Sequence, residues 1–231
     1  MFKNENINWI LIFFIISFCI ENTKAQGITD WDNQFYISNK VATNKGDWRY
    51  SGELQVRLKD NAKSLDVWYF EFVATYMVNK NWEIVPDFRY SIKPTKNEWR
   101  PGLGVIYKHY PKEKIQFVHQ VKYQADVEPG ETKHGLRYVL FFNYLIHEKF
   151  LPNAAIGAFY RWQNDFTGFQ FFRVGVGLAY IINVQHSLNF SYFVGFTDTG
   201  ETWKSQGIPL IQLIININKD YKYVPAKYIN F

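Results

Sequence analysis

Residues 48–58 read WRYSGELQVRL. One parity of this stretch is apolar or aromatic apart from Gly52, and the other parity is charged or polar. A repeat of two residues is typical of a β-strand whose two faces meet different surroundings. The same alternation recurs, in segments of roughly ten residues, along almost the whole chain. The sequence therefore predicts an all-β fold.

The alternating segments carry aromatic residues at both ends, and aromatic side chains make up 19% of the chain. No stretch beyond residue 25 is long and apolar enough for a membrane-spanning helix. Aromatic-ended strands with one apolar face are typical of a transmembrane barrel. We therefore expect a closed antiparallel transmembrane β-barrel of about 10–12 strands, because lipid cannot satisfy an open sheet edge. The alternative is a soluble sandwich or lipocalin-like barrel, which would not need aromatic residues at both ends of nearly every strand.

The predicted strands cover 47–58, 65–78, 81–92, 98–109, 114–126, 133–147, 151–163, 168–182, 186–196 and 207–218. Two flanking segments, 31–42 and 221–231, also alternate, and the second ends in the aromatic residue Phe231. Because outer-membrane barrels of this kind have an even number of strands, we expect both segments to be strands or neither. The longer polar connections are predicted at 59–64, 93–97, 127–132, 164–167 and 197–205. In the ten-strand reading these longer connections are extracellular, and in the twelve-strand reading they are periplasmic.

The N-terminus has the pattern of a secretory signal peptide. Lys3 precedes an apolar run over 9–20, and Ala25 closes a small-residue cleavage site. The run is shorter than the roughly twenty residues of a spanning helix. We therefore expect residues 1–25 to be removed, which leaves 26–231 as the barrel. The only cysteine, Cys19, lies in the removed part, so disulfides and thiolate metal sites are not expected. A lipoprotein site at Cys19 is disfavoured because the bulky Phe18 precedes it.

The predicted outward parity is apolar along the strands and aromatic at their ends. The aromatic residues near the longer connections are Tyr90, Trp99, Tyr123, Tyr138 and Trp162, and those near the short turns are Tyr76, Trp82, Tyr107, Tyr144 and Tyr180. Two girdles of this kind are expected where a barrel crosses the two membrane interfaces.

The predicted inward parity carries one arginine on each of six strands, all toward the same end of the barrel. These residues, which we call the arginine belt, are Arg57, Arg89, Arg100, Arg137, Arg161 and Arg173. Acidic residues on the same parity are Glu53, Glu71, Asp87 and Asp126. A ring of arginines can attract anions to a pore. The alternative is a network of ion pairs that fills a narrow lumen, since barrels of ten to twelve strands are near the size that side chains fill.

The sequence does not indicate catalysis, a cofactor or nucleic-acid binding. Three of the five histidines, His119, His134 and His186, fall on the predicted lipid-facing parity, and Ser187 beside His186 points to the opposite face. No serine-hydrolase arrangement, metal cluster, phosphate loop or dinucleotide motif is present. The net charge of +5 comes from basic residues spread singly along the chain, which does not predict nucleic-acid binding. We therefore expect neither an enzyme nor a cofactor, although a lipid-modifying hydrolase stays as a minor alternative.

The segments from Trp48 to Arg57, from Trp68 to Glu71 and from Phe88 to Tyr90 resemble a family of uncharacterised outer-membrane proteins of Gram-negative envelopes. The strands around Arg137, Arg161 and Arg173 fit the family's habit of one arginine per strand near one barrel end, and the resemblance covers most of residues 31–218. The resemblance implies a domain of unknown function, a β-barrel fold and an outer-membrane location, and it implies no catalytic residue.

The sequence thus leads to a ranked set of functions. The first is porin-like passage or binding of small anionic solutes through the arginine-lined lumen, and the second is a structural or adhesive barrel plugged by its own side chains. The expected partners are outer-membrane lipid, the barrel assembly machinery that reads an aromatic C-terminus, and a small anionic solute.

Overall fold

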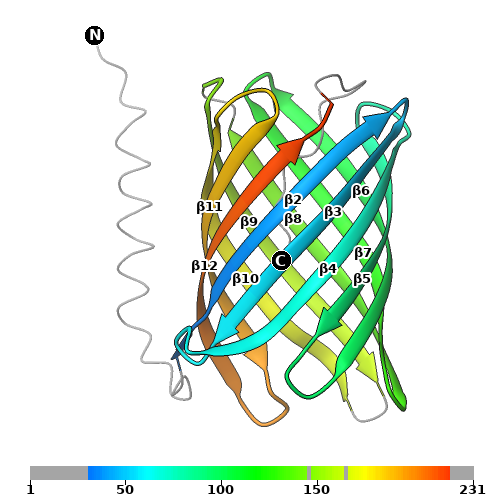
Figure 1. Cartoon of the computed structure of the whole chain (residues 1–231), viewed down its shortest axis with the longest axis vertical. Coiled ribbons are helices and arrows are strands. Elements are labelled where there is room, and N and C mark those ends of the chain that lie inside the picture. The colour runs from blue at the N-terminus through cyan, green and yellow to red at the C-terminus, as the bar shows by residue number, and fades with distance from the viewer. Residues whose placement is uncertain (1–30, 145–146, 164–165, 219–231) are drawn as a thin grey trace.

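The computed structural model describes residues 31–144, 147–163 and 166–218, which form one sheet curled into a barrel (Figure 1). Its strands are β1 (Trp31–Asn33), β2 (Phe35–Lys45), β3 (Trp48–Lys59), β4 (Ser64–Met77), β5 (Trp82–Ile92), β6 (Asn97–Lys112), β7 (Ile115–Glu128), β8 (Glu131–Tyr144), β9 (Phe150–Gln163), β10 (Phe166–Ile181), β11 (His186–Asp198) and β12 (Trp203–Asn216). Within these ranges no helix is long and apolar enough to cross a membrane.

Successive strands from β2 to β12 pair as antiparallel hairpins, and β12 returns to pair with β2. This closing pair is parallel, with Leu210 opposite Tyr36 and Asn216 opposite Ala42. The short β1 continues the seam, because Trp31 lies opposite Ser205 on β12. The expected closed, all-β barrel is confirmed, with β2–β12 as its eleven long strands.

The expectation of an even strand number is wrong for the described residues. The segment predicted at 31–42 is a strand, and 207–218 falls on β12. An odd number of alternating strands brings the first and last strands together in the same direction, which explains the parallel seam. The segment 221–231 with Phe231 and the predicted signal peptide 1–25 lie outside the described residues.

The two parities of each strand separate as the sequence predicts. On β4 the residues Val67, Tyr69, Glu71 and Val73 are buried, while Trp68, Phe70 and Phe72 are exposed on the outside. Large apolar side chains remain exposed around the barrel wall, and Trp99, Tyr123 and Tyr138 of the predicted girdles are among them. Since apolar groups gain by leaving water, an exterior of this kind requires lipid around it.

The connections at the two barrel ends do not differ in length as predicted. The strands extend into the expected loops, so that β7 and β8 are joined by residues 129–130 alone. Gly130 makes this tight turn possible, because its φ of 84° is open to glycine and costly for other residues. At the opposite end, turns such as 46–47 and 113–114 are equally short. The lengths of the described connections therefore do not indicate which end is extracellular.

Candidate functional site in the barrel lumen

The arginine belt lies on the inner face of the barrel, where the sequence places it. Its residues are two to seven positions from the strand ends at which β3 joins β4, β5 joins β6, β7 joins β8 and β9 joins β10. We call this end of the barrel the arginine end. Arg89, Arg100 and Arg137 are buried, whereas Arg57, Arg161 and Arg173 are partly exposed. Strand alternation determines this shared face, and the sheet register determines which of the side chains meet.

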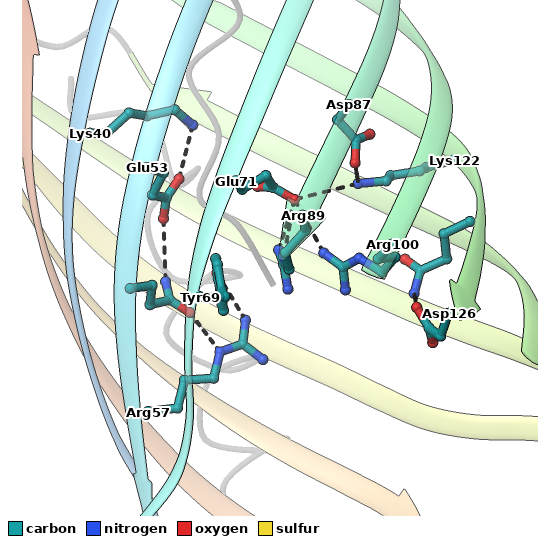
Figure 2. A network of polar contacts seen from close by, with 12 residues as sticks. Lys40, Glu53, Arg57, Tyr69, Glu71, Asp87, Arg89, Arg100, Lys122 and Asp126 are labelled. Carbon is teal, nitrogen blue, oxygen red and sulfur yellow. Dashed lines mark hydrogen bonds and ion pairs between the residues drawn. The ribbon is translucent and has the colours of Figure 1, made fainter. Parts of the chain in front are cut away.

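Glu71 is the centre of an ion-pair network on the wall formed by β4–β7 (Figure 2). Its Oε1 lies 2.9 Å from Nη2 of Arg89, 3.1 Å from Nη2 of Arg100 and 3.7 Å from Nζ of Lys122. Arg89 and Arg100 are direct neighbours across β5 and β6, so their like charges face each other. A single buried carboxylate therefore offsets the repulsion among three cations.

The other three predicted carboxylates also pair with basic side chains. Lys122 donates from Nζ to Asp87 Oδ1 over 2.5 Å, and Asp126 pairs with Arg161. On β2 and β3, Lys40 Nζ lies 3.2 Å from Glu53 Oε2. All four acidic residues proposed from the sequence thus contact basic groups inside the lumen, and Glu71 and Asp126 do so with members of the arginine belt.

Aromatic rings separate several of the arginines from one another. The Tyr69 ring lies between two guanidinium carbons, 3.7 Å from Arg89 and 5.2 Å from Arg57. The Tyr36 ring lies in the same way between Arg57 at 4.5 Å and Arg173 at 6.0 Å. The negative face of an aromatic ring attracts a cation. The rings therefore allow like charges to lie close together around the wall.

The lumen at this level is cationic. In the part of the chain that the structure describes, the arginine belt together with Lys40 and Lys122 makes eight basic side chains, against the four carboxylates Glu53, Glu71, Asp87 and Asp126. Lys40 and Lys122 were not among the lumen residues predicted from the sequence, although strand alternation places both on the inward face. Lys122 lies on the same parity as the inward residues Gln120 and Gln124.

An apolar layer crosses the lumen beyond the arginine belt, which the sequence analysis did not predict. It borders the belt at Tyr36, and its other buried residues include Val85, Ile106, Val118, Val139, Phe141, Phe193, Ile208 and Leu210. On β8, Val139 and Phe141 lie between Arg137 and Asn143, so the layer separates two polar levels. On the far side, Lys108 pairs with Glu83 over 2.9 Å, and both side chains are fully buried. A dry layer of this type can close a pore.

Two of the predicted lipid-facing histidines form hydrogen bonds with tyrosines, whereas His186 bonds Asn183. His119 Nδ1 lies 2.9 Å from the Tyr138 hydroxyl, and His134 Nδ1 lies 2.7 Å from the Tyr123 hydroxyl. Neither pair includes a serine, and among the described residues no group of acidic, histidine or cysteine side chains could hold a metal ion. These pairs satisfy polar atoms at the lipid-facing wall, where an unsatisfied group would be costly.

The model of the family described as "Protein of unknown function (DUF2490)" matches residues 31–206, and the chain belongs to this family. The family membership inferred from sequence resemblance is thereby confirmed. No curated protein matches the chain.

The chain is similar to solved porin structures. The chain is similar to a NanC porin with 11% identity and a TM-score of 0.52, over 76% of this chain and 94% of that porin. It is also similar to a KdgM porin, with 15% identity and a TM-score of 0.44 over 68% of this chain and 80% of that one. A structure of the KdgM porin in complex with disordered oligogalacturonate is 15% identical to the chain. The similarity has a TM-score of 0.46 and covers 70% of this chain and 88% of that porin. The closed barrel, its lipid-facing exterior and its likeness to the NanC porin fold make the chain an outer-membrane β-barrel.

Proposed function

We propose that the chain is a porin-like barrel whose lumen passes or binds small anionic solutes. The observation that carries this proposal is the excess of positive charge at the level of the arginine belt, where eight basic side chains of the described residues face four carboxylates. A cationic lining inside low-dielectric walls raises the local concentration of anions. The NanC porin supports the proposal through its fold alone.

The proposal includes the route of the chain to its membrane. Residues 1–25 serve as a cleaved signal peptide, and 26–231 form the barrel domain that the assembly machinery inserts among outer-membrane lipids. We propose no catalytic role and no cofactor for this chain, whose fold is similar to that of the NanC porin.

Uptake into liposomes tests the proposed function with two solutes of similar size. Purified barrel is reconstituted, and entry of labelled glucuronate is compared with entry of labelled glucose, which lacks the charge. We expect glucuronate to enter faster than glucose, and faster than into protein-free liposomes. Equal entry of the two solutes, or faster entry of glucose, would contradict an anion preference.

A second candidate is a structural barrel of the envelope whose lumen is closed by side chains. The apolar layer favours it, because Ile106 and Val118 have no exposed surface and Ile208 and Leu210 have almost none. In this case neither solute enters the liposomes, and the reconstituted barrel shows no ion conductance.

A further inference from the structure

The members of the arginine belt differ in their charge environment. Arg89 and Arg100 pair with Glu71, and Arg161 pairs with Asp126. Arg57 and Arg173 form no ion pair with any described carboxylate, and both are partly exposed. The positive charge of the lumen is therefore unevenly compensated, and Arg57 and Arg173 are two places where no described carboxylate offsets it.

Arg57 and Arg173 come from β3 and β10 and converge on one tyrosine of β2. Their guanidinium carbons lie 4.5 Å and 6.0 Å from the centre of the Tyr36 ring. The Tyr36 hydroxyl is held in place by donating to Gln34 Oε1 over 2.7 Å. The ring is buried, and it fixes the spacing of two cations that would otherwise repel each other.

Both guanidinium groups keep hydrogen-bonding capacity for a ligand. Arg57 donates from Nε to Gln55 Oε1 over 2.6 Å and from Nη2 to the Tyr69 hydroxyl over 3.3 Å, which orients the group and uses only part of its five N–H donors. Nε of Arg173 is buried and has no hydrogen-bond partner among the described residues. A buried donor without a partner is costly, so an acceptor that reached it would bind favourably.

We infer that Arg57 and Arg173, set around Tyr36, form a binding subsite for a solute that carries a carboxylate. This inference rests on the proposed function, in which the lumen receives small anions. Planar guanidinium groups match carboxylate oxygens with paired hydrogen bonds. Arg57 lies two residues from the end of β3, which places it close to the arginine end of the barrel. Arg89 and Arg100 contribute less to binding of the solute, because the Glu71 carboxylate already neutralises part of their positive charge.

Calorimetric titration of the folded barrel in detergent tests the subsite with glucuronate and, separately, with inorganic phosphate. Arg57→Gln and Arg173→Gln should each weaken glucuronate binding about tenfold or more, the usual loss of one charge-assisted hydrogen-bonded pair. Arg57→Lys keeps the charge and loses the planar fork, so it should weaken binding less than Arg57→Gln. If Arg57→Gln does not fold, Arg57→Lys and Arg173→Gln carry the test.

Arg49→Gln is the matched control. Arg49 lies on the inward parity of β3 as Arg57 does, and it is also partly exposed. It is eight residues away, or about 27 Å along the strand. This variant removes the same charge from the same strand and should leave glucuronate binding unchanged.

Each outcome bears on the subsite separately from the transport proposal. An equal loss of affinity in Arg49→Gln would overturn the inference, since net charge alone would then explain binding. Failure of the unmodified barrel to bind glucuronate, or binding of phosphate in its place, would overturn the carboxylate assignment. Binding that depends on both arginines, without solute uptake into liposomes, would support the subsite and contradict only the porin-like passage.

Discussion

Replacing Glu71 with glutamine should destabilise the barrel more than any other single Glu→Gln change in the described lumen. The Glu71 carboxylate lies within 2.9–3.7 Å of basic atoms of Arg89, Arg100 and Lys122. At an effective dielectric constant of about 20, each contact contributes roughly 5 kcal/mol of gross attraction. Desolvation of the buried groups and repulsion between the two arginines oppose this attraction. Loss of one partner from such a buried network costs about 3–5 kcal/mol, and we expect Glu71→Gln to lose this amount.

Urea unfolding of the barrel in detergent or lipid, followed by tryptophan fluorescence, measures this loss. Glu131→Gln is the control, because the Glu131 carboxylate is about one-third exposed and lies 3.2 Å from Lys133, which also pairs with Glu128. Exposed pairs contribute about 0–1 kcal/mol, so the control should unfold almost as the parent does. If Glu71→Gln changes the free energy of unfolding by less than about 1 kcal/mol, the network does not stabilise the barrel as described.

Two further predictions concern the packing of the wall and its contact with lipid. Gly175→Ala should destabilise the barrel by about 1–3 kcal/mol, because an added Cβ would lie 2.1 Å from the Phe193 ring and 2.6 Å from a backbone oxygen. Gly104→Ala, whose nearest contact would be 3.4 Å, should be neutral or stabilising in the same urea experiment; equal losses in both would refute the packing argument. Val174→Arg, in the middle of β10 and 48% exposed, should cost about 2–4 kcal/mol in lipid. Val184→Arg, in the turn after β10, should cost at most about 1 kcal/mol, and the reverse order would mean that β10 does not face lipid.

The sequence was sufficient for the class of fold and for the faces of the strands. Period-two alternation places Glu71 and Arg89 in the lumen and Phe70 and Tyr90 outside, because successive side chains of a strand point to opposite faces. Strand positions were also predicted within a few residues, as for 98–109 against β6 at Asn97–Lys112.

The ion pairs inside the lumen could not be predicted from the sequence. Alternation shows which face of the sheet a side chain is on, but it does not show the register between neighbouring strands. Arg89 and Arg100 are direct neighbours across β5 and β6, and only Glu71 from the next strand makes that arrangement stable. The contact of Arg173 with Tyr36 requires β10 and β2 to approach within a closed barrel. A sequence read strand by strand contains neither piece of information.

The closure and the loop lengths were misjudged for a similar reason. The rule of an even strand number describes typical outer-membrane barrels, whereas the parallel pair of β12 with β2 depends on how the sheet ends meet. The apolar layer was overlooked because each strand contributes only one or two inward residues to it, such as Ile106 on β6 and Val118 on β7. Their significance emerges only when adjacent strands bring them to one level.

The zero-current potential of the unmodified barrel in a planar bilayer tests the anion-accepting lumen most directly. With a tenfold gradient of potassium chloride across the bilayer, the excess of positive charge around Arg57 and Arg173 predicts a potential with the sign of the chloride equilibrium potential. A potential with the sign expected for potassium, or a bilayer that stays non-conducting after verified insertion, would contradict an anion-selective pore.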